Sequence, residues 1–254
     1  MSMLVDPRWV VSVYLLALRL GVLFVMTPIF STLSGLVAVR ILFTLAVSVV
    51  LIWSVGVRVS DVPLTAGSLF AASMAELMVG ATLAFGVFAA FGAFSVAGKI
   101  LDVQTGFGIG SVFDPVTRAG SPLFATIFNL LAVAVFFGMD GHHALLRGIA
   151  FSVQQVPPGT GFAALPADAV VRQFGLMFSL GMALIAPVVF CLFLVEVGLA
   201  LVSRVLPQMN VFVVGIPVKI VAGIAMFALT IGYLGPAMGR VYASVFNYWE
   251  QVLR

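Results

Sequence analysis

Six apolar blocks, separated by short stretches that are polar or contain glycine and proline, make up most of the chain. They cover residues 10–30, 37–55, 67–97, 121–139, 174–202 and 211–235. Because about 20 apolar residues cross the hydrocarbon core of a bilayer as a helix, each block predicts a membrane helix. The blocks at 67–97 and 174–202 are longer, which leaves open a tilted helix, a helix extending beyond the bilayer, or two helices each. Pro187 predicts a kink in the second of these.

The composition agrees with a protein embedded in a membrane. Of the 254 residues 63% are hydrophobic and only 8% are charged, and the mean hydropathy is +1.24. A soluble domain carries about 25% charged residues, so this chain has too few charges to cover a soluble surface. No polar stretch is long enough to fold separately, and we predict one all-α, membrane-embedded domain over residues 1–254. The single cysteine rules out a disulfide framework. The basic residues are scattered, which argues against a nucleic-acid partner.

The stretch 99–122 between the third and fourth blocks is the most unusual part of the chain. Gly106, Gly108 and Gly110 recur at every second position, and each would cost a helix about 1 kcal/mol. A helix that enters through Lys99 is therefore expected to end near Gly106. Irregular backbone at membrane depth is tolerated only where protein or a water-filled cavity surrounds it. The stretch predicts a pore or gate segment, with an ordinary interfacial loop as the alternative.

Polar residues inside or beside the blocks give further expectations. Arg19 lies in the first block and needs a partner or water, and Glu76 in the third block is the candidate partner. The third block is also rich in small residues at helical spacing, which predicts close helix–helix contacts. A second polar break follows at 203–212. The segment 240–254 combines aromatic and charged residues, a pattern that favours a membrane interface.

Candidate chemistry is sparse. Asp140, His142 and His143 make a poor set of metal ligands, since no other histidine is present, and we predict a polar helix end or turn there without a metal. The nine carboxylates are dispersed, and no nucleophile elbow, phosphate loop or HExxH motif occurs. We therefore expect no enzyme and no cofactor. The residues alone leave a pore-lining or assembly-forming membrane protein, with a solitary small-molecule transporter or a membrane enzyme as alternatives.

Three segments together resemble one protein family. They are DVQTGFGIGSVFDP at 102–115, DGHH at 140–143 and SRVLPQMNVFVVGIPVK at 203–219. In this order and spacing they resemble the FliR family of flagellar type III export-gate proteins, whose injectisome counterpart is SctT. The amino-acid sequence of the third segment is more similar to that of the flagellar branch of the family.

The resemblance implies a fold, partners and a location. The fold would be a polytopic membrane protein of long, kinked helical hairpins that pack with sister subunits into a tube-like export gate. The implied companions are FliP and FliQ in one complex, with FlhB and FlhA. Unfolded flagellar proteins would cross the bacterial inner membrane through this channel at the flagellar basal body, and the outer surface would meet membrane lipid.

The resemblance also assigns residues to two roles. The family's channel-closing plug loop matches 104–121, which implies a plug made by Gln104, Gly106, Phe107, Gly108, Gly110, Phe113, Asp114 and Pro115. Asp114 and Pro115 would anchor the return of the loop. The polar break would supply subunit contacts or assembly residues, namely Arg204, Pro207, Gln208 and Asn210.

Overall fold

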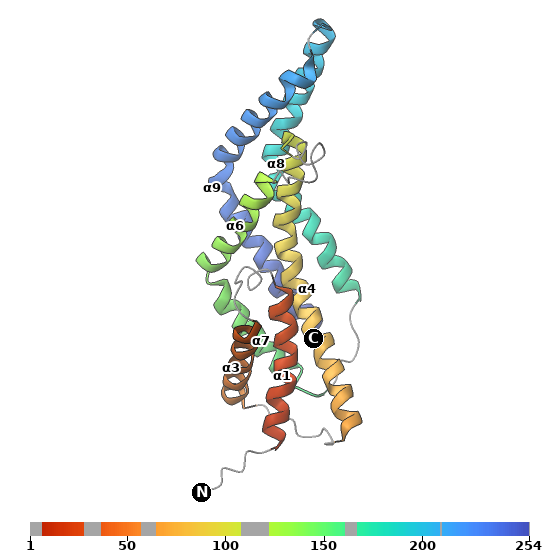
Figure 1. Ribbon diagram of the computed structural model, residues 1–254, viewed down its shortest axis with the longest axis vertical. Helices are drawn as coiled ribbons and strands as arrows, with labels where there is room; N and C mark the ends of the chain where they lie inside the picture. Colours follow the sequence, from red (N-terminus) through yellow and green to blue (C-terminus); the bar gives the residue numbers. More distant parts are fainter. Residues whose placement is uncertain are drawn as a thin grey trace. The chain divides into compact units, whose positions relative to one another are not determined.

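The computed structural model describes residues 7–27, 37–56, 65–107, 122–160, 167–208 and 210–253, and every regular element in these ranges is an α-helix (Figure 1). The helices are α1 (Pro7–Met26), α3 (Val37–Val55), α4 (Ala66–Thr105), α6 (Leu123–Gly138), α7 (Gly141–Gln155), α8 (Ala167–Val205) and α9 (Val211–Leu253). By length and composition, five of them are candidate membrane spans, or six if α6 and α7 together count as one. The predicted all-α membrane protein is confirmed.

The long apolar blocks form single helices. The third block lies in α4, which has 40 residues, and the fifth lies in α8, which has 39. At 1.5 Å per residue each is about 60 Å long, roughly twice the thickness of a bilayer core. Pro187 lies inside α8 without ending it. The alternative of two helices per block is therefore wrong.

The structure adds one helix that the apolar blocks did not predict. The predicted polar helix end or turn at Asp140 is present, and α7 follows it directly, with buried residues Leu145, Ile149 and Val153 that recur every four positions. The segment 240–254 continues α9, and Tyr248 and Trp249 are buried within the chain, each 2% exposed, while the predicted membrane interface stays a prediction. Aromatic rings with few charges suit a helix contact as well as a lipid headgroup region.

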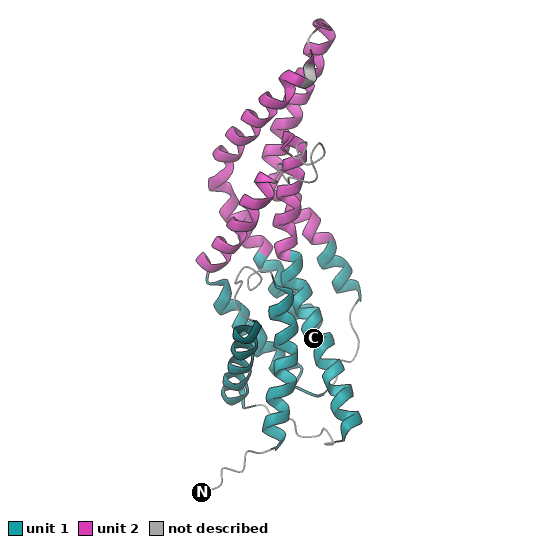
Figure 2. Ribbon diagram, in the orientation of Figure 1, with its two compact units in different colours: residues 1–89, 140–174, 242–254 teal, residues 90–139, 175–241 magenta. Residues whose placement is uncertain are grey.

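The chain forms two compact units (Figure 2). Unit 1 comprises Met1–Ala89, Asp140–Phe174 and Tyr242–Arg254, and unit 2 comprises Ala90–Met139 and Gly175–Val241. The helices α4, α8 and α9 contribute residues to both. A single domain over 1–254 stays a prediction beside this division.

Unit 1 is organised around α1 and the first part of α4. Leucines 15, 16, 20 and 23 of α1 are fully buried, and α3 packs against both α1 and α7. Close approach depends on glycine: a Cβ on Gly80 would lie 2.6 Å from the carbonyl oxygen of Arg19. Near the C-terminal end of α9, Trp249 lies against Gly86 and Gly148, and its Nε1–H donates to the Leu83 carbonyl at 3.0 Å.

Unit 2 is built on the second part of α4 with α6 and the middle of α8 and α9. Phe94, Leu101, Phe124, Phe128 and Leu192 are among its fully buried apolar side chains. Here too, small residues of α4 allow close contacts, since a Cβ on Gly98 would lie 2.6 Å from the backbone nitrogen of Ala125 in α6. The close helix–helix contacts predicted for the third block are confirmed in both units.

The helices differ in how much of their apolar surface the chain itself covers. In α4, 67% of the most apolar stretch is buried, whereas the values for α3, α8 and α9 are 17%, 17% and 11%. Burial of apolar surface is the main favourable term in folding, and α4 obtains it inside the chain. The other three helices leave large apolar surfaces for lipid or for other proteins.

Candidate functional site at the end of α4

The predicted break in the helix after Asp102 is present. Thr105 is the last residue of α4, and Gly106 follows with φ at +91°, a backbone conformation that side chains with a Cβ rarely adopt. Gln104, Gly106 and Phe107 are half-buried. The other residues predicted for the plug lie outside the described residues, namely Gly108, Gly110, Phe113, Asp114 and Pro115.

Asp102 connects the end of α4 with the start of α6. Its Oδ1 accepts the backbone N–H of Phe124 at 2.8 Å, and its Oδ2 accepts the N–H of Ala125 at 2.9 Å. The side chain is 2% exposed. The first N–H groups of a helix lack partners within the helix, and here a carboxylate from another helix satisfies two of them. The two ends of the central stretch are thereby held together.

A cluster of aromatic rings packs beside this carboxylate. Phe107 makes an edge-on contact with Phe124 at 5.9 Å between ring centroids, and Phe124 makes another with Phe227 of α9 at 5.6 Å. Phe128 completes the cluster at 5.5 Å from Phe227. Such pairs add about 0.5–1.5 kcal/mol beyond their buried area. The first residue after Gly106 is thus packed onto α6, and Phe124 and Phe128 join α6 to α9.

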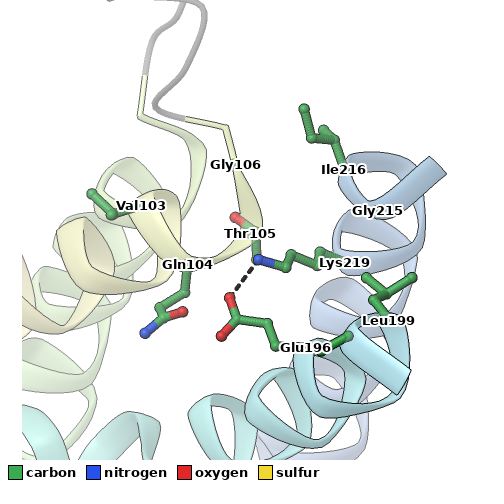
Figure 3. A pocket seen from close by; sticks show the side chains of 10 residues that line it. Val103, Gln104, Thr105, Gly106, Glu196, Leu199, Gly215, Ile216 and Lys219 are labelled. Atoms are coloured by element: carbon green, nitrogen blue, oxygen red, sulfur yellow. Dashed lines mark hydrogen bonds and ion pairs between the residues drawn. The ribbon is translucent and has the colours of Figure 1, made fainter. Parts of the chain in front are cut away.

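A pocket of about 390 Å³ opens beside the end of α4, between that helix and the hairpin of α8 and α9 (Figure 3). Val103, Gln104, Thr105 and Gly106 line one side. The other residues come from α8 and α9, namely Glu196, Leu199, Ala200, Gly215, Ile216 and Lys219.

The charges in this pocket form a pair. Lys219 extends from α9 towards the end of α4, and its Nζ donates to the Glu196 carboxylate of α8 (Figure 3). The side chains are 23% and 41% exposed, so solvent screens the pair and its contribution to stability is small, at about 0–1 kcal/mol. The pair joins α8 to α9 beside the pocket.

The residues predicted for assembly lie at the end of α8, which contains Arg204, and on the turn that joins α8 to α9. Arg204, Pro207, Gln208 and Asn210 are all exposed. Asn210 also precedes α9, and its Oδ1 accepts the N–H of Val213 at 3.4 Å, as a helix N-cap does. The turn therefore presents polar groups at a surface with exposed apolar neighbours, including Val205 and Leu206.

The pairing of Arg19 with Glu76 is confirmed, inside unit 1. Arg19 Nε lies 2.6 Å from Glu76 Oε2, and Nη2 lies 3.1 Å from Oε1, which is a two-pronged contact. Arg19 also donates to Ser152 O and Oγ and to Val156 O, and Glu76 Oε1 accepts the N–H of Gly159. Both side chains are at most 2% exposed. This network joins α1, α4 and the end of α7.

Asp140, His142 and His143 each offer a ligand atom, and these atoms lie within 4.8 Å of one another. Asp140 and His143 are exposed, and His143 Nδ1 lies 3.4 Å from Asp140 Oδ1. Asp140 has φ at 56° and marks the turn between α6 and α7. His142 and His143 lie in the first turn of α7, directly after this turn.

Sequence reasoning missed two features of this region. Asp102 was counted among the polar residues of the central stretch, but a carboxylate that lies one turn before a glycine break, with a helix start to follow, is a usable capping signal. The pair formed by Glu196 and Lys219 was also missed. Two isolated opposite charges in successive apolar helices indicate a pair, for the same reason that predicted the pairing of Arg19 with Glu76.

Comparison with known proteins defines the class. The family described as Bacterial export proteins, family 1, matches residues 10–245, and the chain belongs to this family. Its relatives carry a more specific name. The chain is 32% identical to the flagellar biosynthetic protein FliR of Bacillus subtilis (strain 168) over 182 residues, which are 70% of each chain. It is 26% identical to FliR of Escherichia coli (strain K12) over 237 residues, covering 93% of this chain and 90% of the relative.

A relative from a different secretion system matches over a shorter range. The chain is 29% identical to the Yop proteins translocation protein T of Yersinia pestis over 147 residues, covering 57% of this chain and 56% of the relative. The resemblance to the FliR family and its injectisome counterpart, drawn from three short segments, is therefore confirmed.

Proposed function

We propose that this chain is a subunit of the flagellar type III protein export gate, located in the bacterial inner membrane at the flagellar basal body. The observation that carries the proposal is the family match over 10–245, together with FliR relatives aligned over most of both chains. The long apolar helices agree with a membrane location. The role is that of a channel component rather than an enzyme.

The proposed companions are FliP and FliQ in one complex, with FlhB and FlhA nearby. The large uncovered apolar surfaces of α3, α8 and α9 support a chain that completes its packing with other proteins. The proposed contact with a neighbouring subunit is the end of α8 and the turn after it, with Arg204, Pro207, Gln208 and Asn210, because the polar groups there are exposed beside apolar residues.

The central stretch is proposed to close the channel. Gln104, Gly106 and Phe107 would begin the plug, and Gly108, Gly110, Phe113, Asp114 and Pro115 would complete it. The support is that α4 stops at Thr105, that Gly106 turns the backbone, and that apolar residues flank the glycines. Unfolded flagellar proteins would displace this plug as they pass.

The test is purification of the tagged chain from its native membrane in mild detergent, with mass spectrometry of the proteins that accompany it. Recovery of FliP-like and FliQ-like proteins in one stable particle is expected. A clean monomer or homo-oligomer, obtained while those proteins are expressed, would contradict the proposal and favour a solitary transporter.

An injectisome export gate is the second candidate, favoured by the similarity to the Yop translocation protein T. The same purification separates the two, because the companions would then belong to an injectisome. Deletion of the gene gives a second reading: loss of motility supports the flagellar role, and loss of effector secretion with intact motility supports the other.

A further inference from the structure

We propose that Asp102 is a positioning residue that holds the end of α4 and the start of α6 together. The inference rests on the proposed function only where leakage through the gate is measured. The geometry itself is independent of that function. It concerns only the end of α4 and the start of α6, both in unit 2.

The contact is built like a helix cap, but it comes from far away in the chain. Pro122 precedes α6 and makes no side-chain hydrogen bond to it. Asp102 supplies the missing acceptors from α4, with bonds of 2.8 Å and 2.9 Å to residues 22 and 23 positions further on. A carboxylate at this place also interacts favourably with the positive end of the helix dipole.

The side chain at position 102 has to be a carboxylate. Two successive N–H groups point at it, and each needs its own acceptor oxygen. An asparagine has the same shape but only one oxygen, so its amide N–H groups would face a second donor. With the side chain 2% exposed, water cannot replace the lost acceptor.

Gly98 brings the start of α6 within reach of Asp102. A Cβ at position 98 would lie 2.6 Å from the backbone nitrogen of Ala125 and 2.8 Å from the carbonyl oxygen of Phe124, and closer still to the Cα of Ala125. Gly98 lies one helical turn before Asp102, on the same side of α4. The glycine allows the close approach and the carboxylate stabilises it. Replacing either residue should therefore separate the end of α4 from the start of α6.

The experiment measures the separation of the two ends directly. Cys191, the only cysteine, is replaced by alanine, and spin labels are attached through cysteines at Val103 and Thr126, both exposed. The full chain is purified with the membrane proteins that accompany it, and the distance distribution is recorded by electron paramagnetic resonance. Asp102→Asn and Gly98→Ala are each expected to broaden and lengthen it. Loss of a hydrogen bond to a buried charge should raise the released fraction about tenfold.

Two matched variants serve as controls. Asp168→Asn makes the same chemical change at a carboxylate that is 85% exposed, and Gly175→Ala adds a Cβ where nothing lies within 4 Å. Both should leave the distribution unchanged. A narrow, parent-like distribution in folded Asp102→Asn and Gly98→Ala protein would overturn the proposal. If the Asp102→Asn protein does not accumulate in cells, Gly98→Ala still tests the proposal.

A second measurement separates this inference from the proposed function. Leakage of ions and small solutes through cells carrying each variant reports on closure of the gate. Longer distances with increased leakage support both statements. Longer distances without leakage support the clamp at Asp102 and overturn the assignment of the central stretch as the seal.

Discussion

The buried pair of Arg19 and Glu76 gives a prediction with a calculable size. Arg19 has five N–H donors, and the structure gives five bonds: two to Glu76, two to Ser152 and one to Val156. Glu76→Gln keeps the shape but removes the negative charge. The guanidinium then remains buried without a counter-charge, because Arg19 is 0% exposed.

The expected loss follows from that uncompensated charge. Breaking a buried ion pair by removing one partner costs about 3–5 kcal/mol. For a domain of this size, about 2–4 °C of apparent Tm corresponds to each kcal/mol, so Glu76→Gln should lower the Tm by about 6–20 °C. The assay is thermal unfolding of the purified chain in detergent, followed by the fluorescence of its three tryptophans.

A double variant sharpens the reasoning. Arg19→Met with Glu76→Leu removes both charges, so no charge is left without a partner. Its main cost is the loss of partners for the Val156 carbonyl and the Gly159 N–H, at about 1 kcal/mol each. The double variant should therefore unfold at a higher temperature than Glu76→Gln alone.

The matched control is the exposed pair of Asp168 and Arg172 on α8, with side chains 85% and 61% exposed. Asp168→Asn should change the stability by no more than about 0.5 kcal/mol, since exposed pairs one helical turn apart contribute little. A shift as small as this in Glu76→Gln, or a double variant less stable than that single variant, would refute the argument from burial.

Three further predictions concern helix packing and the ion pair beside the pocket. Gly80→Ala should destabilise the chain by about 1–3 kcal/mol, because its Cβ would lie 2.6 Å from the backbone of α1. Gly21→Ala should not destabilise it, because nothing lies within 4 Å of that position, and thermal unfolding compares the two variants. Trp249→Ala should cost about 3–5 kcal/mol by leaving a cavity, measured in the same way, and an unchanged Tm would show that the ring is not packed as described. Lys219→Met should change stability by less than about 1 kcal/mol, since Glu196 is 41% exposed; a larger loss in the same assay would mean that the pair is not screened.

Much of the architecture was predictable because it follows from solvation. Apolar runs long enough to cross a bilayer became helices, and the glycine at 106 ended one of them. The pairing of Arg19 with Glu76 was predictable for a related reason: isolated opposite charges in apolar helices are costly unless they meet. Their other partners are mostly backbone groups, which leave no trace in the sequence.

The features that were missed depend on tertiary contacts. The helix α7 was not among the predicted apolar blocks because polar residues lie at both of its ends, although Leu145, Ile149 and Val153 already had helical spacing. Trp249 was assigned to a membrane interface because an aromatic residue near charges fits either setting. Its position was decided by Gly86 and Gly148, which leave room for the ring from two other helices.

The place of Trp249 has a consequence for how the protein is made. Unit 1 takes its last segment from Tyr242–Arg254, about 100 residues after Gly148, against which the indole packs. A ribosome adds about 5–20 residues per second, so the surface that receives this ring stays open for roughly 5–20 seconds of translation. During that interval the early helices can be inserted into the membrane, but they lack the packing of Trp249. Unit 1 is completed only after the segment that ends α9 has been synthesised.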